Sequence, residues 1–385
     1  MTKRIPILIL LFCTISVLQC REKYDPPIID SNPDFLVVDG ILVGGSDSTK
    51  IFLSRTRKLS EGDTSIVEKG ASVVVQDANG NTIYLLQELS SSPGTYGIAG
   101  MDLIAGNSYK LRIATLNGKS YISDPIIFKN TPVIDSVNWI KPEKDVTIYV
   151  NAKDQQNNTR YYRWQFEETW EYYSPYQSGY IYDQANDNVL PRNPDDSINH
   201  CWRTQYSKDL LIASTEKFSD DIVINQVVRT IPYGAFELGN KYSILVKQYT
   251  LNKEGFDYLQ ILKRVSEQSN SLFSAQPSQL AGNIHNSVDP NETVIGYITA
   301  SQVSSKRIFI ERSEVEPWGY SLACATRFVP DNPDSIRFYF QEGHYPQYIP
   351  LTYINGITSG YFAAEPACTD CRILGGVTRK PDFWQ

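Results

Sequence analysis

Residues 71–87, ASVVVQDANGNTIYLLQ, decide the fold class. Two runs rich in β-branched and large apolar residues, Ala71 to Gln76 and Thr82 to Gln87, lie on either side of Asp77-Ala78-Asn79-Gly80. Two such runs around an Asn-Gly turn predict a β-hairpin, because the turn needs residues that accept a positive φ. The surrounding sequence extends this β pattern.

Further strands are expected on both sides of this hairpin. Phe35 to Val43 has a strong β composition, and a second turn at Asn117-Gly118 leads into Tyr121 to Ile127. Short strands at this spacing, with Asn-Gly turns and no helical period, predict a sandwich of immunoglobulin-like or prealbumin-like type. We therefore assign residues 35–128 to an N-terminal β-sandwich domain.

A second, larger part follows a break at Asn130-Thr131-Pro132. We expect residues 133–385 to form a mainly β domain. Its predicted strands are Val146 to Val150, Arg160 to Trp170, Ile222 to Ile231, Tyr242 to Tyr249, Thr293 to Thr299 and Arg307 to Ile310. The whole chain is thus predicted to be mainly β, a sandwich followed by a β-rich domain.

One amphipathic helix is expected in this second domain, near residues 253–268. Asn252 is a suitable N-cap, because its side-chain oxygen can accept a backbone N–H of the first turn. The apolar residues recur at three-residue spacing and form one stripe, which comprises Phe256, Leu259, Leu262 and Val265. Such a stripe favours packing against a sheet over exposure as a partner-binding surface.

The N-terminus has the pattern of an export signal. Lys3 and Arg4 precede an apolar run from Ile5 to Leu18, and the run stops at Cys20. At about 14 residues it is too short to cross roughly 30 Å of hydrocarbon, so we interpret residues 1–19 as a signal peptide. A cysteine at this boundary is the residue that a bacterial lipoprotein pathway acylates. An ordinary secretory signal is the alternative, since Gln19 departs from the usual small-residue preference.

Lipidation of Cys20 would tether the protein to a membrane without embedding it. Residues 20–34 contain Pro26, Pro27 and Pro33 and no apolar periodicity, which indicates an extended tether. Elsewhere no run approaches eighteen consecutive apolar residues, the length typical of a membrane helix. The expected membrane contact is therefore the N-terminal lipid.

Charge and motifs exclude several function classes. The chain has 36 Lys and Arg against 43 Asp and Glu, and this acidic balance argues against a nucleic-acid partner. His200, His285 and His344 lack metal-ligand spacing, and neither a nucleophile elbow nor a phosphate loop occurs. We therefore assign no catalytic residue, metal or cofactor. Glycosidases need only two well-placed carboxylates, so an enzyme remains an alternative.

Four cysteines remain after the signal and the lipidation site: Cys201, Cys324, Cys368 and Cys371. In an oxidising envelope, an even number indicates two disulfides, with three possible pairings that the sequence does not separate. The Cys368-Thr369-Asp370-Cys371 segment also matches half of a zinc site or a redox pair. Redox pairs normally open a helix, however, and Pro366 and Gly375-Gly376 indicate a loop here.

The segment from Tyr161 to Tyr182 is about half aromatic. In its first part, apolar and polar residues alternate in a pattern typical of a half-buried strand. Its second part, with Ser174-Pro175 and Gly179, is predicted to be a loop. The loop tyrosines are candidates for stacking on a ligand or sealing an interface, namely Tyr172, Tyr173, Tyr176, Tyr180 and Tyr182. A loop folded onto its own sheet is the alternative.

Several short motifs resemble those of the bacterial envelope lipoprotein family catalogued as domain of unknown function 4249. They are Phe35 to Gly40, Ile134 to Val137, Cys201-Trp202, Tyr242 to Tyr249, Gln276 to Gln279, Gly282 to Ile284, Gly296-Tyr297, Lys306 to Ile310, Cys371-Arg372, Gly375-Gly376 and Lys380 to Trp384. The resemblance covers nearly the whole mature chain. It implies an outer-membrane lipoprotein associated with a TonB-dependent transporter, and it defines no catalytic residues.

Three hypotheses for function follow. The leading one is a non-enzymatic, lipid-anchored accessory protein that binds a nutrient or a TonB-dependent transporter. The second is a surface adhesin or assembly factor. The third is a glycan- or peptide-degrading enzyme, which would require a deep pocket with two facing carboxylates.

Replacing Cys20 by alanine tests the anchor. We expect the Cys20→Ala protein in the soluble fraction and the unaltered protein in the membrane pellet after a salt wash. The reason is that each buried methylene contributes ~0.8 kcal/mol, so two or more acyl chains hold a protein essentially permanently. Fractionation with immunoblotting measures the distribution, and Cys13→Ala, within the apolar run, is the matched control. A Cys20→Ala protein found wholly in the pellet contradicts the prediction.

Overall fold

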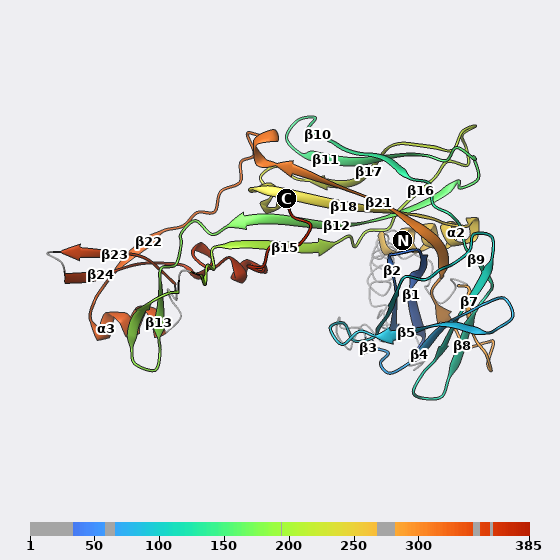
Figure 1. The fold of residues 1–385 in the computed structure, drawn as a ribbon, viewed down its shortest axis with the longest axis horizontal. Helices are drawn as coiled ribbons and strands as arrows, with labels where there is room; N and C mark the ends of the chain where they lie inside the picture. The colour runs from blue at the N-terminus through green and yellow to red at the C-terminus, as the bar shows by residue number, and fades with distance from the viewer. Residues whose placement is uncertain (1–33, 58–65, 194, 268–281, 342–346, 355–356) are drawn as a thin grey trace, which may run out of the picture.

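The computed structural model describes residues 34–57, 66–193, 195–267, 282–341, 347–354 and 357–385. The signal peptide 1–19, Cys20 and the tether up to residue 33 lie outside the described residues, as do Gln276 to Gln279 of the family resemblance. The fold is mainly β, as predicted. Figure 1 shows a sandwich, a long central sheet with a smaller sheet over it, and a separate distal sheet.

The N-terminal sandwich contains the predicted hairpins. Val73 pairs with Leu86 across the first, and Gly80 in its turn has a φ of 86°. The strands are β1 (Leu36–Gly44), β2 (Ser48–Arg55), β3 (Ile66–Val67), β4 (Ser72–Gln76), β5 (Thr82–Glu88), β6 (Thr95–Ala99), β7 (Ser108–Ala114), β8 (Ser120–Ser123) and β9 (Ile126–Ile127). Its core is fully apolar at the centre, where Leu36, Leu53 and Val73 are 0% exposed.

Residues from the C-terminal half complete this sandwich. β19 (Ile284–Asn286) pairs with β8, and β20 (Val294–Ile295) pairs with β1. Ile284, Val294 and Ile298 belong to the same buried cluster as the N-terminal strands. The sequence division at residues 129–132 assigned these residues to the second domain, and the structure adds them to the first core.

The central sheet carries the second domain. It consists of β12 (Tyr161–Tyr173), β15 (His200–Tyr206), β16 (Leu211–Ser214), β18 (Lys241–Thr250) and β21 (Thr299–Glu311). β12 and β18 are its two central strands, and both pair antiparallel along ten residues. The predicted strand Thr293 to Thr299 covers β20 and only the first residue of β21, and Arg307 to Ile310 covers a short part of β21, which runs for 13 residues.

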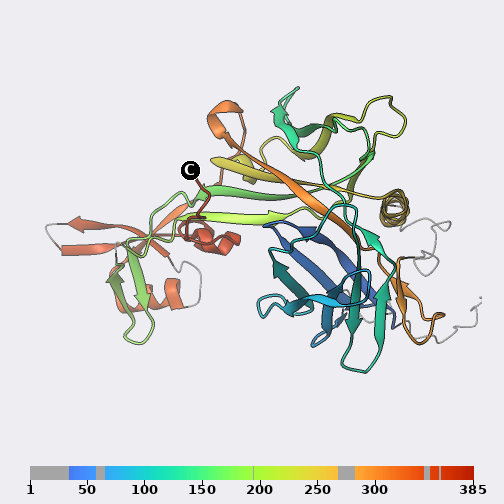
Figure 2. The ribbon, with the colours of Figure 1, turned by 45° about the vertical axis from the view of Figure 1, so that its right-hand side comes forward.

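Both faces of the central sheet are covered. A three-stranded sheet of β10 (Ile134–Ile140), β11 (Val146–Lys153) and β17 (Ile222–Ile231) packs on one face, and Val150, Trp164 and Ile244 lie in the core between the two sheets. The sandwich and the C-terminal tail cover the other face, as Figures 1 and 2 show. In the tail, Trp384 is 5% exposed and contacts Phe309 of β21.

The predicted helix is present as α2 (Lys253–Glu267). Its cap is the expected one, because the backbone N–H of Gly255 donates to the Asn252 side chain at 3.1 Å. Phe256 and Leu259 are buried against Tyr161 and Leu251, whereas Leu262 is half-buried. The helix therefore packs over one end of the central sheet.

The distal sheet lies away from the rest of the protein (Figure 1). It contains β13 (Tyr180–Asp183), β14 (Asn188–Pro191), β22 (Thr326–Pro330), β23 (Gln347–Ile354) and β24 (Ile357–Ala364), with the short helix α3 (Pro333–Ile336) beside it. The remaining helical turns are Phe236–Leu238, Arg312–Glu314, Arg337–Gln341, Pro366–Cys368 and Cys371–Leu374. The core of the distal sheet includes Val189, Val329 and Tyr361.

A charged pair between the central and three-stranded sheets joins the buried Glu168 to the half-buried Arg229. Glu168 is 4% exposed, and its carboxylate accepts from Arg229 at 2.9 Å and from the Tyr242 hydroxyl at 2.8 Å. Arg229 also contacts Glu237 at 3.3 Å. Because buried charges destabilise unless they are paired and hydrogen-bonded, this complete network explains how the core tolerates them. Burial, with the charge of Glu168, raises the pKa of Tyr242 well above 10.

Tyr242→Phe tests this network. The variant should lose roughly 1.5–3 kcal/mol of unfolding free energy at pH 7, the usual contribution of a hydrogen bond to a charged group. Because the pKa of Tyr242 is raised in the folded state, its contribution is complete below the unfolded pKa of about 10 and declines above it. Denaturant titrations from pH 7 to 11 should therefore show the stability gap between wild type and variant narrowing above pH 10.

Tyr84→Phe, on the half-buried outer part of the sandwich, is the matched control for loss of a tyrosine hydroxyl. The Tyr84 hydroxyl accepts the backbone N–H of Asp102 at 2.9 Å, so the variant measures the loss of a tyrosine hydroxyl outside the charged network. A constant gap between wild type and Tyr242→Phe across this pH range would contradict the assigned cause.

Candidate functional site

A cleft lies between the sandwich and the central sheet. Its floor is one face of β12 and β18, because alternate residues of a strand lie on the same face. Arg163 and Gln165 of β12 face the cleft, opposite Tyr162 and Trp164 in the core. The sheet register places Tyr249 beside Arg163 and Lys247 beside Gln165.

The wall of the cleft comes from the sandwich. β1 contributes Asp39 and Ile41, β2 contributes Lys50 and Phe52, and Asp47 comes from the turn between them. Together the floor and wall enclose a cavity of about 400 Å³. This volume is within the range of small-molecule sites in proteins. Figures 1 and 2 show β1 and β2 directly beneath the central strands.

The cleft is held open by backbone hydrogen bonds. Residues 299–302 of β21 pair with β1, and residues 303–311 of the same strand pair with β18. The linker between the domains is also fixed, since the Thr131 hydroxyl donates to the Gln302 carbonyl at 2.6 Å and the Gln248 amide donates to the Pro132 carbonyl at 2.8 Å. The wall and the floor are therefore positioned by the same strand.

Two ion pairs engage charged groups of the cleft. Lys247 contacts Asp47 at 3.1 Å and so bridges floor and wall. Glu167 contacts Arg307 at 3.0 Å, and the ring of Phe383 lies 3.5 Å from that guanidinium. Lys247, Asp47 and Glu167 therefore each have an oppositely charged partner within the protein.

Arg163 is different. It is 8% exposed, yet it has no hydrogen-bond or ion-pair partner among the residues that the structure describes. Its nitrogens are not fully enclosed, so the guanidinium opens onto the cavity of the cleft, where its low exposure leaves it only partly hydrated. Within the same described ranges, the Gln165 amide and the Tyr249 hydroxyl also lack hydrogen-bond partners. Burial raises the pKa of Tyr249 to about 12, so its hydroxyl is a hydrogen-bond donor at neutral pH.

This arrangement suits binding of a negatively charged group. An arginine offers five N–H donors in a planar fork that matches an oxyanion, and such hydrogen bonds are strongest where water is excluded. The rest of the lining is mixed, with apolar side chains such as Ile41, Val43 and Phe52 beside charged and hydroxyl-bearing ones. The cavity therefore suits a ligand that has both a polar and an apolar part.

The predicted tyrosine loop is wrong in part. Tyr172 is on β12, is 2% exposed and donates its hydroxyl to the Cys371 carbonyl at 2.7 Å, so it is a core residue. Tyr173 is also on β12, because the strand is longer than the sequence indicated. Tyr180 and Tyr182 are on β13, and both are half-buried. Tyr176 lies between these strands and donates to the Cys324 carbonyl at 3.1 Å.

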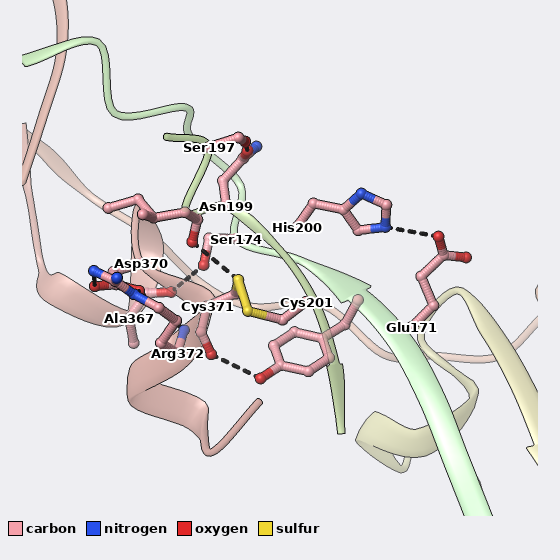
Figure 3. Close-up of a disulfide and its surroundings, with 12 residues drawn as sticks. Glu171, Ser174, Ser197, Asn199, His200, Cys201, Ala367, Asp370, Cys371 and Arg372 are labelled. Carbon is pink, nitrogen blue, oxygen red and sulfur yellow. Dashed lines mark hydrogen bonds and ion pairs between the residues drawn. A yellow bond between two sulfur atoms is a disulfide. The ribbon is translucent and has the colours of Figure 1, made fainter. Parts of the chain in front are cut away.

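Tyr173 is the one of these five tyrosines that is mainly exposed, at 50%. Its ring stacks on His200 at 4.1 Å, and the His200 ring lies 4.1 Å from Trp202. His200 contacts Glu171 at 2.7 Å, an interaction shown in Figure 3. A binding role for Tyr173, Tyr176, Tyr180 and Tyr182 stays a prediction.

The four cysteines form two disulfides. Cys201 on β15 pairs with Cys371, and Cys324 pairs with Cys368. Cys368 and Cys371 therefore belong to different bridges, which rules out the redox pair and leaves no thiolate of this set for zinc. Figure 3 shows the first bridge beside Ser174, whose hydroxyl donates to the Ala367 carbonyl at 2.9 Å.

A metal site is not evident in the described part of the chain, where no group of three His, Cys, Asp or Glu side chains is placed to hold an ion. Among the same residues, no helix has the length and apolar character needed to cross a membrane.

Residues 21–307 match the family defined by a domain of unknown function, DUF4249. The chain belongs to this family. The match includes β12, β18 and the first part of β21, and with them both the floor and the wall of the cleft. No curated protein matches the chain significantly.

Two solved structures with partial similarity to this DUF4249 member are distant from it. The chicken interferon gamma receptor alpha chain is 9% identical over 55% of this chain and 88% of its own, with a TM-score of 0.15. Escherichia coli alpha-2-macroglobulin activated by porcine elastase is 14% identical over 58% of this chain and 19% of its own, with a TM-score of 0.19. At these TM-scores the similarities carry no argument about the site.

Sequence reasoning missed the cleft. It interpreted Arg163, Gln165 and Glu167 as the solvated face of a half-buried strand. The one local signal is an arginine within the densely aromatic run from Tyr161 to Phe166, where a solvated edge is unusual. The partners on the wall are more than 100 residues earlier in the sequence, so no local pattern brings them together.

Removal of the Cys324–Cys368 bridge should destabilise the distal sheet. The bridge closes a 44-residue separation, for which chain entropy predicts a loss of about 4 kcal/mol. The double variant Cys324→Ser with Cys368→Ser should therefore expose the distal sheet to limited proteolysis, with cleavage followed by mass spectrometry. Ser321→Ala is the control in the same segment. Equal proteolysis of the double variant and wild type would show that the bridge does not hold the distal sheet.

Proposed function

We propose that this protein is a lipid-anchored, non-enzymatic accessory protein of the outer membrane. It binds a nutrient or a TonB-dependent transporter, and the cleft between sandwich and central sheet is its ligand site. The N-terminal sandwich supplies one wall of that site as well as spacing from the membrane.

The observation that carries the binding role is the unpartnered Arg163 in the cleft. Proteins rarely bury an unpaired charge, because the lost hydration destabilises the fold. Where one is retained at the surface of a preformed cavity, a ligand that supplies the counter-charge is the simplest compensation. The position of Arg163, beside the apolar wall of Ile41 and Val43, meets that condition.

Binding fits the cleft better than hydrolysis does. A glycosidase needs two carboxyl groups facing each other, one as proton donor and one as base or nucleophile. Asp47 and Glu167 are each engaged by a cation at about 3 Å, and Asp39 is the one remaining cleft carboxyl. The described residues of the cleft therefore do not include a facing pair.

The anchor rests on the N-terminal sequence, with its apolar run ending at Cys20. Two disulfides among the described residues agree with an oxidising compartment outside the cytoplasm. The transporter as partner rests on the resemblance to envelope lipoproteins associated with TonB-dependent transporters.

Co-purification tests the transporter partnership. The full chain carries an affinity tag inserted at the exposed turn near Gly118, because the C-terminal residue Gln385 accepts a contact from Lys241 and is unsuitable. After solubilisation in mild detergent from the native host, the tagged protein should elute with a TonB-dependent transporter identified by mass spectrometry. Cys20→Ala with the same tag is the control, and it should capture much less because it leaves the membrane.

Elution of the lipidated protein alone, at low salt and in two detergents, would exclude a stable transporter partner. The nutrient-binding part of the proposal would then depend on the cleft.

A further inference from the structure

We propose that the cleft binds the carboxylate of an organic ligand that carries an apolar group next to it. The ligand is either a small organic acid or the C-terminus of a peptide, which present the same chemistry. This inference rests on the proposed binding role of the cleft and names the ligand class.

The charge balance of the cleft selects a single negative charge. Arg163, Lys247 and Lys50 line it together with three carboxylates, those of Asp39, Asp47 and Glu167. Lys247 is compensated by Asp47, and Glu167 is compensated by Arg307 outside the lining. Lys50 and Asp39 are exposed and opposite in charge, so Arg163 is the buried cation left without a counter-charge, and one monovalent oxyanion completes the pairing.

A carboxylate fits this balance better than a phosphate group does. A phosphate carries about two negative charges at neutral pH, and it would lie near Asp39, Asp47 and Glu167 in a cavity of about 400 Å³. Like charges at short distance repel strongly where water is excluded. A carboxylate instead accepts two parallel hydrogen bonds from one guanidinium without excess charge.

Neighbouring polar groups add donors on either side of Arg163. Tyr249 is its direct partner across the β12–β18 register, and residues opposite each other lie about 4.5–5.5 Å apart at Cβ. Gln165 is the next residue on the same face of β12, about 7 Å along the strand. Both side chains lack partners among the described residues, so the Tyr249 hydroxyl and the Gln165 amide are able to donate to the carboxylate or to an adjacent polar atom.

The apolar side chains of the cleft wall indicate that the ligand also carries an apolar group. Ile41 and Val43 are 5% and 4% exposed and cluster with Tyr249, while Phe52 continues the apolar surface toward β2. The cavity thus has apolar side chains packed around Tyr249, which lies opposite Arg163 in the sheet. An aliphatic or aromatic group adjacent to the carboxylate would be buried there, and its burial contributes about 25 cal/mol for each Å² removed from water.

If Arg163 had a purely structural role, its replacement would have the opposite effect on stability. Such a residue stabilises the fold through the packing of its aliphatic stem, so replacing it lowers the melting temperature. A residue kept for a ligand costs stability in the empty protein, because its charge is desolvated without compensation. Arg163→Met keeps most of the stem and removes the charge, which separates the two cases.

The experiment measures binding of defined probes to the purified full chain by saturation-transfer NMR and calorimetry. The probes are 3-phenylpropanoate, its neutral amide, phenyl phosphate, and one tetrapeptide ending in phenylalanine with either a free or an amidated C-terminus. The variants are Arg163→Met and Arg163→Lys. Arg112→Met is the matched control, because Arg112 is an exposed arginine on the sandwich outside the cleft lining.

We expect 3-phenylpropanoate to bind at least tenfold more tightly than its amide and than phenyl phosphate. Arg163→Met should weaken binding of the acid at least tenfold, the equivalent of about 1.4 kcal/mol. Arg163→Lys should retain part of the affinity, since it keeps the charge but not the fork, and Arg112→Met should bind as wild type does. Without ligand, the melting temperature of Arg163→Met should equal or exceed that of wild type.

If the tetrapeptide with a free C-terminus binds more tightly than 3-phenylpropanoate, the inference holds and the ligand is a peptide C-terminus. If 3-phenylpropanoate binds more tightly, the inference holds and the ligand is a small organic acid. Equal binding of acid and amide, or preferential binding of phenyl phosphate, overturns it without any variant. Saturation-transfer signals absent for every probe at 10 mM also overturn it. Because these measurements use protein in solution, they are independent of transporter co-purification, and each result stands if the other fails.

Discussion

The structure depends on one strand that belongs to two sheets. β21 hydrogen-bonds through its first four residues to β1 of the sandwich and through the next nine to β18 of the central sheet. Separating the two parts would break backbone hydrogen bonds on both sides, and Thr131 and Gln248 fix the linker in addition. The cleft is therefore formed before any ligand arrives, which reduces the entropy lost on binding.

The sequence predicted local features well because their causes are local. The Asn-Gly turns defined the hairpins, and Asn252 with the apolar stripe defined α2. It missed the middle of β21, where Ser304, Ser305 and Lys306 interrupt the apolar pattern, although backbone pairing with β18 continues through them. It ended β12 early for a related reason, since Tyr172 is buried by the C-terminal segment around Cys371, 199 residues away.

The site itself was hidden from the sequence by the same long-range effect. Alternation along β12 correctly placed Arg163 and Gln165 on the face opposite Tyr162 and Trp164. A strand pattern gives the side of the sheet on which a residue lies, but it does not say what covers that side. Here the sandwich, joined through β21, covers that side of the sheet. Arg163, which the strand pattern places on a solvated face, is therefore only 8% exposed. The even number of cysteines likewise predicted two bridges but not their pairing.

The two faces of β12 provide an internal comparison of buried charge. On the core face, Glu168 is matched by Arg229 and by the Tyr242 hydroxyl, so the fold itself satisfies the charge. Five residues earlier, on the cleft face, Arg163 is 8% exposed and the described residues leave it without a hydrogen-bond or ion-pair partner. Sequences that break a rule of stability at one point usually do so where function requires it. On this strand the buried carboxylate of Glu168 is satisfied by protein groups and the guanidinium of Arg163 is not, which supports the proposal that the counter-charge of Arg163 comes from a ligand.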